Sequence, residues 1–214
     1  MLKRFDNYDE LYNSFKWFIP EHYNIASDTI EKFANTERIA LKHVLDDGNH
    51  KEFSFKYLNQ KSNQLANVLD SVSLKDDDRV GIILGQCPET ILSHMACFKS
   101  GKISIPLFSL FGDDALLFRL KDSGASTVIC DDSSIDKILR INEFLPCLKN
   151  IISINRLKSD EIVQSFYELI DNASDEYKNV KSKSNDPALI IYTSGTTGDP
   201  KGALLPHKVL LGHI

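Results

Sequence analysis

The sequence lacks the features that would place a protein in a membrane or on nucleic acid. No apolar run approaches the ~20 residues that a membrane-spanning helix needs. The 25 basic and 30 acidic residues give a net charge of −5, and no polybasic stripe occurs. The densest charge run, residues 75–79 (KDDDR), has mixed sign and is typical of a solvated turn. We therefore expect no nucleic-acid partner and no membrane span.

Closely spaced cysteines and a leader peptide are also lacking. The N-terminal 26 residues place charges too close together to contain the apolar core of a signal peptide. No pair of cysteines has the close spacing of a zinc knuckle or a redox motif, and each lies in an apolar neighbourhood, so we expect buried, reduced thiols and a cytoplasmic protein. The chain contains four cysteines: Cys87, Cys97, Cys130 and Cys147.

What the chain does contain is a regular alternation of strand-like and helix-like segments. Its 214 residues fit one large domain or two small ones. A short helix within 25–34 precedes two strand-like runs, 39–45 and 51–58, on either side of an Asp-Gly turn. Apolar runs then predict strands, and apolar spacing predicts helices. The strands are expected at 79–85, 102–108, 126–132, 150–155 and 188–192, and the helices at 55–72, 88–100, 113–123, 133–144 and 160–172. This order predicts an α/β fold of βαβ units, with a mostly parallel sheet flanked by helices.

One break in composition divides the predicted fold. Residues 174–187 are polar and poor in large apolar side chains, so we interpret them as a linker. Residues 1–173 are then an N-terminal α/β portion. Residues 188–214 hold a strand, a glycine-rich loop and the start of a helix near Pro206.

The most informative stretch is the loop at residues 192–202 (YTSGTTGDPKG). Gly195 and Gly198 can take positive φ and expose backbone N–H groups, because no Cβ blocks close approach. Hydroxyl groups add further donors, and Lys201 adds a compact positive charge. A concave set of N–H groups with one cation suits an oligophosphate. A threonine hydroxyl can also ligate Mg²⁺.

Two common nucleotide-binding loops do not fit this spacing. A Walker A loop counted from Gly195 needs glycine where Pro200 stands, and Ser or Thr where Gly202 stands. A dinucleotide-binding G-x-G-x-x-G fails at Thr197. The remaining alternative is a polar loop without a ligand, but an arbitrary loop rarely combines this strand, this glycine spacing and a Pro-Lys-Gly.

The loop resembles the signature loop of the adenylate-forming, or AMP-binding, enzymes. These include acyl-CoA synthetases, peptide-synthetase adenylation domains and beetle luciferase. The match is full-length, and Asp199 occupies the one freely varying position. Residues 79–107 resemble the early strand–helix–strand of this family. Residues 106–129 and 201–213 resemble the acetyl- and medium-chain acyl-CoA synthetase branch. The resemblance covers nearly the whole chain and implies an incomplete, N-terminal part of the adenylate-forming fold.

The resemblance implies a ligase that uses ATP, Mg²⁺ and coenzyme A. A carboxylate attacks the α-phosphate to give an acyl-adenylate and pyrophosphate, and the CoA thiol then displaces AMP. The loop would hold the β- and γ-phosphates and stabilise the charge on the leaving pyrophosphate. Lys201 and Thr196 take catalytic roles on this basis, Thr196 contacts the metal, and Asp199 faces solvent. The implied phosphate contacts are Thr193, Ser194, Gly195, Thr196, Thr197, Gly198 and Lys201.

Other polar residues have simpler interpretations. His207 follows the loop and is interpreted as a contact at a helix start, and His94 as a structural residue on a helix. Asp131 and Asp132 could ligate a metal, but two carboxylates between a strand and a helix more often begin and cap the helix.

The resemblance also implies motifs that the 214 residues do not contain. In the family, the acyl pocket, much of the adenine pocket, the Glu that helps to bind Mg²⁺, the Asp that holds the ribose and the adenylation lysine follow the loop. We therefore expect an N-terminal fragment of an acid–CoA ligase that forms no acyl-adenylate alone. The alternative is a non-catalytic nucleotide-binding or regulatory module. The failed Walker spacing argues against an unrelated phosphate-binding enzyme. A complementing C-terminal half or a second copy would be the protein partner.

Overall fold

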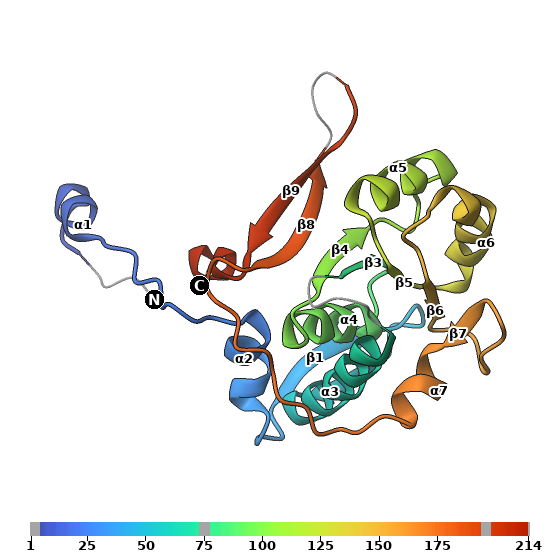
Figure 1. Cartoon of the computed structure of the whole chain (residues 1–214). Helices are drawn as coiled ribbons and strands as arrows, with labels where there is room; N and C mark the ends of the chain where they lie inside the picture. The colour runs from blue at the N-terminus through green and yellow to red at the C-terminus, as the bar shows by residue number, and fades with distance from the viewer. Residues whose placement is uncertain (1–4, 73–77, 194–197, 214) are drawn as a thin grey trace.

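The core of the molecule is a twisted sheet of seven strands (Figure 1). The computed structural model describes residues 5–72, 78–193 and 198–213. In the described residues the strand order is β7-β6-β5-β3-β4-β8-β9, and every neighbouring pair is parallel except β8 and β9. The strands are β3 (Arg79–Ile83), β4 (Ile103–Leu107), β5 (Thr127–Cys130), β6 (Asn150–Ser153), β7 (Val163–Ser165), β8 (Pro187–Thr193) and β9 (Lys201–Pro206).

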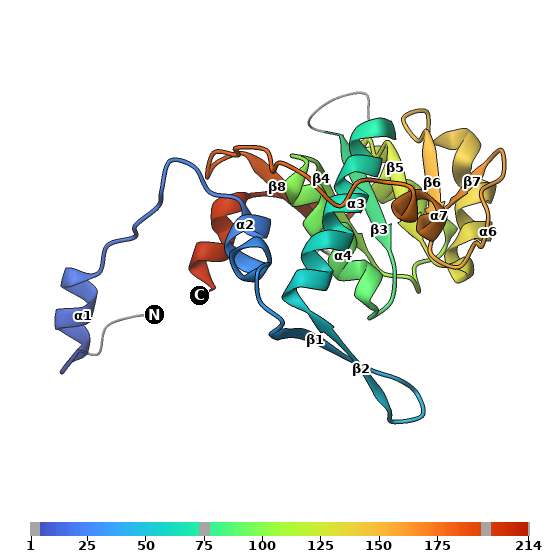
Figure 2. The ribbon, with the colours of Figure 1, turned by 90° about the horizontal axis from the view of Figure 1, so that it is seen from below.

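Helices cover both faces of this sheet (Figures 1 and 2). One face packs against α3 (Phe55–Val72), α4 (Pro88–Lys99) and α7 (Phe166–Asp171), and the other against α5 (Asp113–Ser123) and α6 (Asp132–Ile141). Successive strand residues alternate between the two cores: Ile82 faces α3 and α4, and Ile83 faces α5 and α6. Strands buried on both faces read as continuous apolar runs. The predicted α/β fold with a mostly parallel sheet is confirmed.

The N-terminal third adds a separate hairpin and an N-terminal arm, residues 5–20. Helix α1 (Tyr8–Ser14) has no buried residue and projects away from the sheet in both ribbon views. Helix α2 (Ile25–Thr29) and the short 3₁₀ helix η1 (Glu31–Phe33) follow, and β1 (Ile39–Val44) and β2 (His50–Ser54) pair antiparallel. The predicted Asp-Gly turn lies between β1 and β2, so this hairpin is confirmed, but residues 55–58 of the second strand-like run form the start of α3 instead.

The helix predicted at 160–172 is wrong in its first half. Residues 163–165 form β7, and α7 starts only at Phe166. The Asp160 side chain accepts the backbone N–H groups of Ile162 and Val163, at 2.9 and 2.7 Å, so this segment turns before it can become helical. Ser165 caps α7 by accepting from the Glu168 N–H. The S-x-x-E spacing of this cap was the sequence signal for the later start.

The segment after the loop also differs from the prediction. Residues 201–206 form β9, which the sequence analysis did not predict, and residues 207–212 form a 3₁₀ helix, η3 (His207–Gly212). A 3₁₀ helix η2 (Asn142–Phe144) likewise takes the last turn of the helix predicted at 133–144. The signature residues 192–202 therefore begin in β8 and end in β9, the two strands of one hairpin.

The expectation that all four thiols are buried is also wrong. Cys97 and Cys130 are buried, but Cys87 is only half-buried and Cys147 is exposed. Cys147 lies in the turn between η2 and β6, where Leu145 and Leu148 take the inward positions. Burial raises the pKa of both Cys97 and Cys130 to about 12, so these two thiols stay protonated.

The predicted linker 174–187 crosses the body in an extended path. Ser182 and Ser184 are buried, the Val180 N–H donates to the Lys99 carbonyl, and the Tyr23 N–H donates to the Ser182 carbonyl. The segment thus joins the N-terminal third to the sheet and leads directly into β8. The proposed division at 173 and 187 remains a prediction.

Candidate phosphate-binding site

The candidate site is the end of the β8–β9 hairpin. Because β8 is parallel to β4, its last residue, Thr193, lies at the carboxyl edge of the sheet. Ligands of open α/β sheets bind at this edge. Thr193 is paired directly with Lys201 across the hairpin, and both residues are exposed. The strand register therefore presents a hydroxyl and an ammonium group side by side.

Gly198 and Gly202 have different reasons to be glycine. Gly198 takes φ of +104° with nothing within 4 Å of an added Cβ, so its backbone conformation excludes other residues while its surroundings stay open. Gly202 has no such conformation, but an added Cβ would lie 3.1 Å from Cζ of Tyr192 and 3.0 Å from Cγ2 of Ile190. Gly202 thus leaves room for the Tyr192 ring on the neighbouring strand.

The positive charge at the site belongs to Lys201. In the described residues this ammonium group has no ion pair, whereas Asp199 nearby is exposed to solvent. An exposed, unpaired lysine next to open backbone fits a phosphate group. Of the predicted contacts, the structure brings Thr193, Gly198 and Lys201 together on the hairpin. Ser194, Gly195, Thr196 and Thr197 lie outside the described residues, and with them the predicted metal contact.

The described part of the chain offers no alternative metal site. Within residues 5–72, 78–193 and 198–213, no three His, Cys, Asp or Glu side chains are grouped closely enough to hold a metal ion. Asp131 is the N-terminal flanking residue of α6, and its carboxylate accepts a hydrogen bond from the Ser133 hydroxyl at 2.6 Å. Asp131 and Asp132 therefore begin α6 as predicted, but the predicted cap is wrong, because the Asp131 side chain accepts no backbone N–H of the helix.

The two histidines considered above have structural contacts. His207 begins η3, and its Nδ1 accepts the Ile25 N–H at 3.3 Å. Nδ1 of His94 lies 2.9 Å from the Ser104 hydroxyl. Burial lowers the pKa of each imidazole to about 4, so both are neutral at physiological pH. A neutral imidazole supplies no positive charge that could attract a phosphate group.

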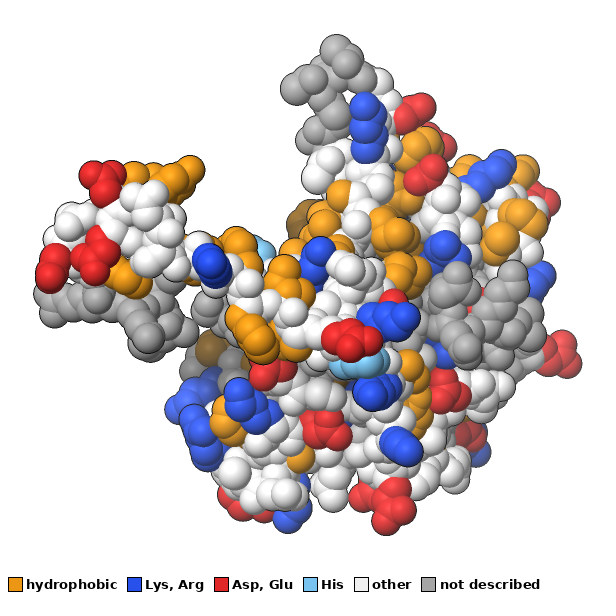
Figure 3. All heavy atoms as spheres, turned by 60° about the vertical axis from the view of Figure 1, so that its left-hand side comes forward, with side chains coloured by type: hydrophobic (Ala, Val, Ile, Leu, Met, Phe, Trp, Pro, Cys, Tyr) orange, Lys and Arg blue, Asp and Glu red, His pale blue; other side chains and the backbone are white. Residues whose placement is uncertain are grey.

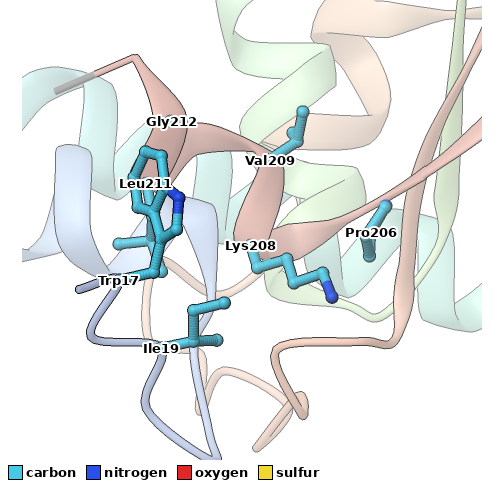
Figure 4. Close-up of a pocket in the computed structure, with 7 residues that line it drawn as sticks. All are labelled: Trp17, Ile19, Pro206, Lys208, Val209, Leu211 and Gly212. Carbon is cyan, nitrogen blue, oxygen red and sulfur yellow. The ribbon is translucent and has the colours of Figure 1, made fainter. Parts of the chain in front are cut away.

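Two hollows lie near the hairpin. One, of about 350 Å³, lies between α4 and the carboxyl ends of β3, β4 and β8, and includes Thr90, His94 and Tyr192 in its lining. The other, of about 300 Å³, lies between the arm and η3, where Trp17 and Ile19 face Leu211 and Lys208 (Figure 4). The arm also carries exposed hydrophobic side chains (Figure 3), and Trp17 and Phe18 among them are aromatic. Neither hollow contains an acidic or basic cluster.

A family model described as AMP-binding enzyme matches residues 30–213, which include the whole sheet and the hairpin. The chain belongs to the AMP-binding enzyme family. An acyl-coenzyme A synthetase of Rattus norvegicus, ACSM3, is 35% identical over 210 residues, or 93% of this chain. The acetyl-coenzyme A synthetase of Chlorobaculum tepidum is 29% identical over 207 residues, or 88% of this chain. The family and the type of relative agree with the resemblance carried by residues 192–202.

Solved structures of AMP-binding enzymes have the same fold. An acyl-CoA synthetase of Brucella canis superimposes with a TM-score of 0.86 over 97% of this chain, at 24% identity. The anthranilate CoA ligase AuaEII, solved with anthranoyl-AMP, superimposes with a TM-score of 0.79 over 89% of this chain, at 25% identity.

The AMP-binding relatives are much longer than this chain. It spans 36% of the rat protein, 31% of the Chlorobaculum protein and 39% of the Brucella chain. The rat relative is a mitochondrial protein, so the predicted cytoplasmic location of this chain stays a prediction. In the described residues no helix has the length and apolar character needed to cross a membrane.

Proposed function

We propose that this chain carries the phosphate-binding hairpin of an AMP-forming acid–CoA ligase. The observation that carries the proposal is the pairing of two signature residues, Thr193 and Lys201, where β8 ends at the carboxyl edge of the sheet. The substrates would be MgATP, a carboxylic acid and coenzyme A. The names of the rat, Chlorobaculum and Brucella relatives support a CoA ligase.

In this proposal Lys201 supplies positive charge and the backbone around Gly198 supplies N–H donors. Lys201 would bind the β- and γ-phosphates and stabilise the charge that develops on pyrophosphate as the carboxylate attacks the α-phosphate. The pairing with Thr193 holds Lys201 at one place along the hairpin, which reduces the reorganisation needed when phosphate binds. Thr196 would contact Mg²⁺ through its hydroxyl, an oxygen ligand of the kind that Mg²⁺ prefers.

The binding part of the proposal is tested by titrating the chain with MgATP. Lys201→Ala should weaken binding about ten-fold or more, because a hydrogen bond to a charged group contributes about 1.5–3 kcal/mol. Lys51→Ala is the matched control, since Lys51 is also an exposed lysine on a strand of a hairpin, β2. Equal affinities of the two variants would exclude Lys201 from the phosphate site.

The catalytic part needs a second assay. Pyrophosphate release from MgATP is measured with a panel of short and medium carboxylic acids. We expect the 214-residue chain to bind MgATP without turnover, because the family's Glu, Asp and Lys motifs do not occur in it. Turnover would overturn this expectation and assign ligase activity to the chain itself. Binding without turnover is also what the alternative, a nucleotide-binding regulatory module, predicts. Addition of a complementing C-terminal half separates the two, since only a ligase fragment gains turnover.

A further inference from the structure

Backbone pairing between the β8–β9 hairpin and β4 covers only a short length. The register between β4 and β8 consists of a single pair, Ser104 with Leu189, which lies four residues before the end of β8 at Thr193. Beyond Leu189, the described part of β8 pairs only with β9. Figure 1 shows the hairpin leaving the plane of the sheet along this stretch. Side-chain contacts must therefore determine where the end of the hairpin lies.

One side chain near the end of β8 reaches the body. Tyr192 packs against the core beneath α5, and its hydroxyl donates to Oδ2 of Asp122 at 2.6 Å. The backbone carbonyl of Arg119, one helical turn earlier on α5, lies 3.1 Å from the same hydroxyl. Burial, followed by the hydrogen bond to Asp122, raises the pKa of Tyr192, so the hydroxyl stays a donor at neutral pH. This contact is one residue away from the Thr193–Lys201 pair.

The Tyr192 ring is also enclosed on its sides. The Arg119 guanidinium lies 5.8 Å from the centre of this ring and 4.2 Å from that of Phe111. Arg119 Nε is buried and has no hydrogen-bond partner among the described residues, so aromatic faces take the place of polar partners on this side. On the neighbouring strand β9, the ring occupies the space that a side chain at position 202 would need. These contacts hold one side of the ring against α5 and β9.

We propose that Tyr192 and Asp122 are positioning residues, whose contact holds the hairpin against α5 and so places Lys201 at the carboxyl edge of the sheet. The placement of the hairpin stands on the contacts alone. Its consequence for MgATP rests on the function proposed above. If the contact had a purely structural role, its loss would lower the stability of the fold, as the loss of any hydrogen bond can, but would leave the hairpin where it is.

The first test compares two tyrosine variants. Tyr192→Phe removes the hydroxyl and keeps the ring. Tyr177→Phe is the matched control, because the Tyr177 hydroxyl donates to Oδ2 of Asp70 at 2.7 Å, away from the hairpin. Amide hydrogen exchange is followed by NMR. We expect the amides of residues 190–193 in β8 and 201–204 in β9 to exchange about 3- to 10-fold faster in Tyr192→Phe, as the loss of one net hydrogen bond predicts. Tyr177→Phe should leave these amides unchanged.

Asp122 supplies a test by rescue. Asp122→Ala removes the acceptor and should reproduce the faster exchange of Tyr192→Phe. Asp122→Asn keeps an acceptor oxygen within reach of the hydroxyl and should stay close to wild type. A role of Asp122 through its charge alone would instead make the Ala and Asn variants behave alike. Unchanged hairpin exchange in both Tyr192→Phe and Asp122→Ala would overturn the proposal.

A parallel MgATP titration separates this inference from the proposed function. If wild type binds MgATP, Tyr192→Phe and Asp122→Ala should bind it several-fold more weakly, and Tyr177→Phe should bind it like wild type. Equal affinity in all variants would refute the claim that the contact positions Lys201 for phosphate. If wild type does not bind MgATP, the proposed function fails, and hydrogen exchange still decides whether Tyr192 and Asp122 hold the hairpin.

Discussion

The central strands and the β8–β9 hairpin belong to one sheet but are held in different ways. Residues of β3 and β5 have parallel neighbours on both sides and are buried against helices on both faces. The hairpin has one bridge to β4, and Ile191 and Leu204 on it are 39% and 54% exposed. Packing on both faces therefore determines the central strands, whereas the hairpin is held by two buried side chains of β8, Ala188 and Ile190, and by a few specific contacts toward its end. Of these two regions, the less packed one carries the described signature residues.

The same contrast holds for two lysines. Lys99 is fully buried between α4 and α3, where its Nζ donates to Oδ1 of Asn59 at 2.8 Å and to Oδ1 of Asn63 at 2.5 Å. Among the described residues, every hydrogen-bond partner of Nζ is neutral, and these hydrogen bonds connect α4 to α3. Lys201 is exposed and has no ion pair among the described residues, which leaves it available to an incoming anion. Burial makes one lysine structural, and exposure leaves the other available for a ligand.

The largest expected effect compares two isoleucines. Ile129→Ala, in the central strand β5 at 0% exposure, should lower the free energy of unfolding by about 2–5 kcal/mol, because it leaves a cavity in a closed core. Ile191→Ala, on the hairpin, should lower it by less than ~1 kcal/mol. Urea unfolding of both variants measures the difference. Similar losses would show that the hairpin is packed as firmly as the body.

A smaller effect is expected from Lys99. Burial lowers its pKa from 10.5 to about 8, and Glu31 partly opposes this shift. Between these values the unfolded chain keeps a proton that the folded chain has lost, so the free energy of unfolding should rise with pH. The rise attributable to Lys99 should be about 2 kcal/mol between about pH 7.5 and 9.5.

Lys99→Met is the control for this pH dependence. It fills the same space and cannot titrate, so subtracting its stability profile isolates the contribution of Lys99. Parallel profiles for wild type and Lys99→Met would show that the lysine is not held at a lowered pKa. In that case the contrast with Lys201 would rest on exposure alone.

The sequence predicted the body better than the hairpin, for physical reasons. Buried parallel strands are continuous apolar runs, so β3, β5 and β6 are visible in residues 79–85, 126–132 and 150–155. Three-residue β7 is too short for such a pattern, and the hydrogen bonds of Asp160 that precede it depend on local geometry. Strand β9 starts with Lys-Gly, a pair typical of a loop, and it is extended because it pairs with β8.

The candidate site was predictable in its chemistry and not in its arrangement. The charge of Lys201 and the conformational freedom of Gly198 follow from residue type. The pairing of Lys201 with Thr193 depends on strand register, and the contact of Tyr192 with Asp122 joins residues 70 positions apart. Periodicity and spacing report on neighbours in sequence and contain no information about such a pair.

The most direct test of the central claim is to map the MgATP-binding site on the chain by amide NMR. The β1–β2 hairpin serves as an internal reference, because it is also exposed and antiparallel but lacks the signature. We expect MgATP to shift the amide signals around Gly198, Lys201 and Gly202 and to slow their exchange, and to leave the turn between β1 and β2 unchanged. Changes confined to other segments, with residues 198–202 unaffected at saturating MgATP, would contradict it.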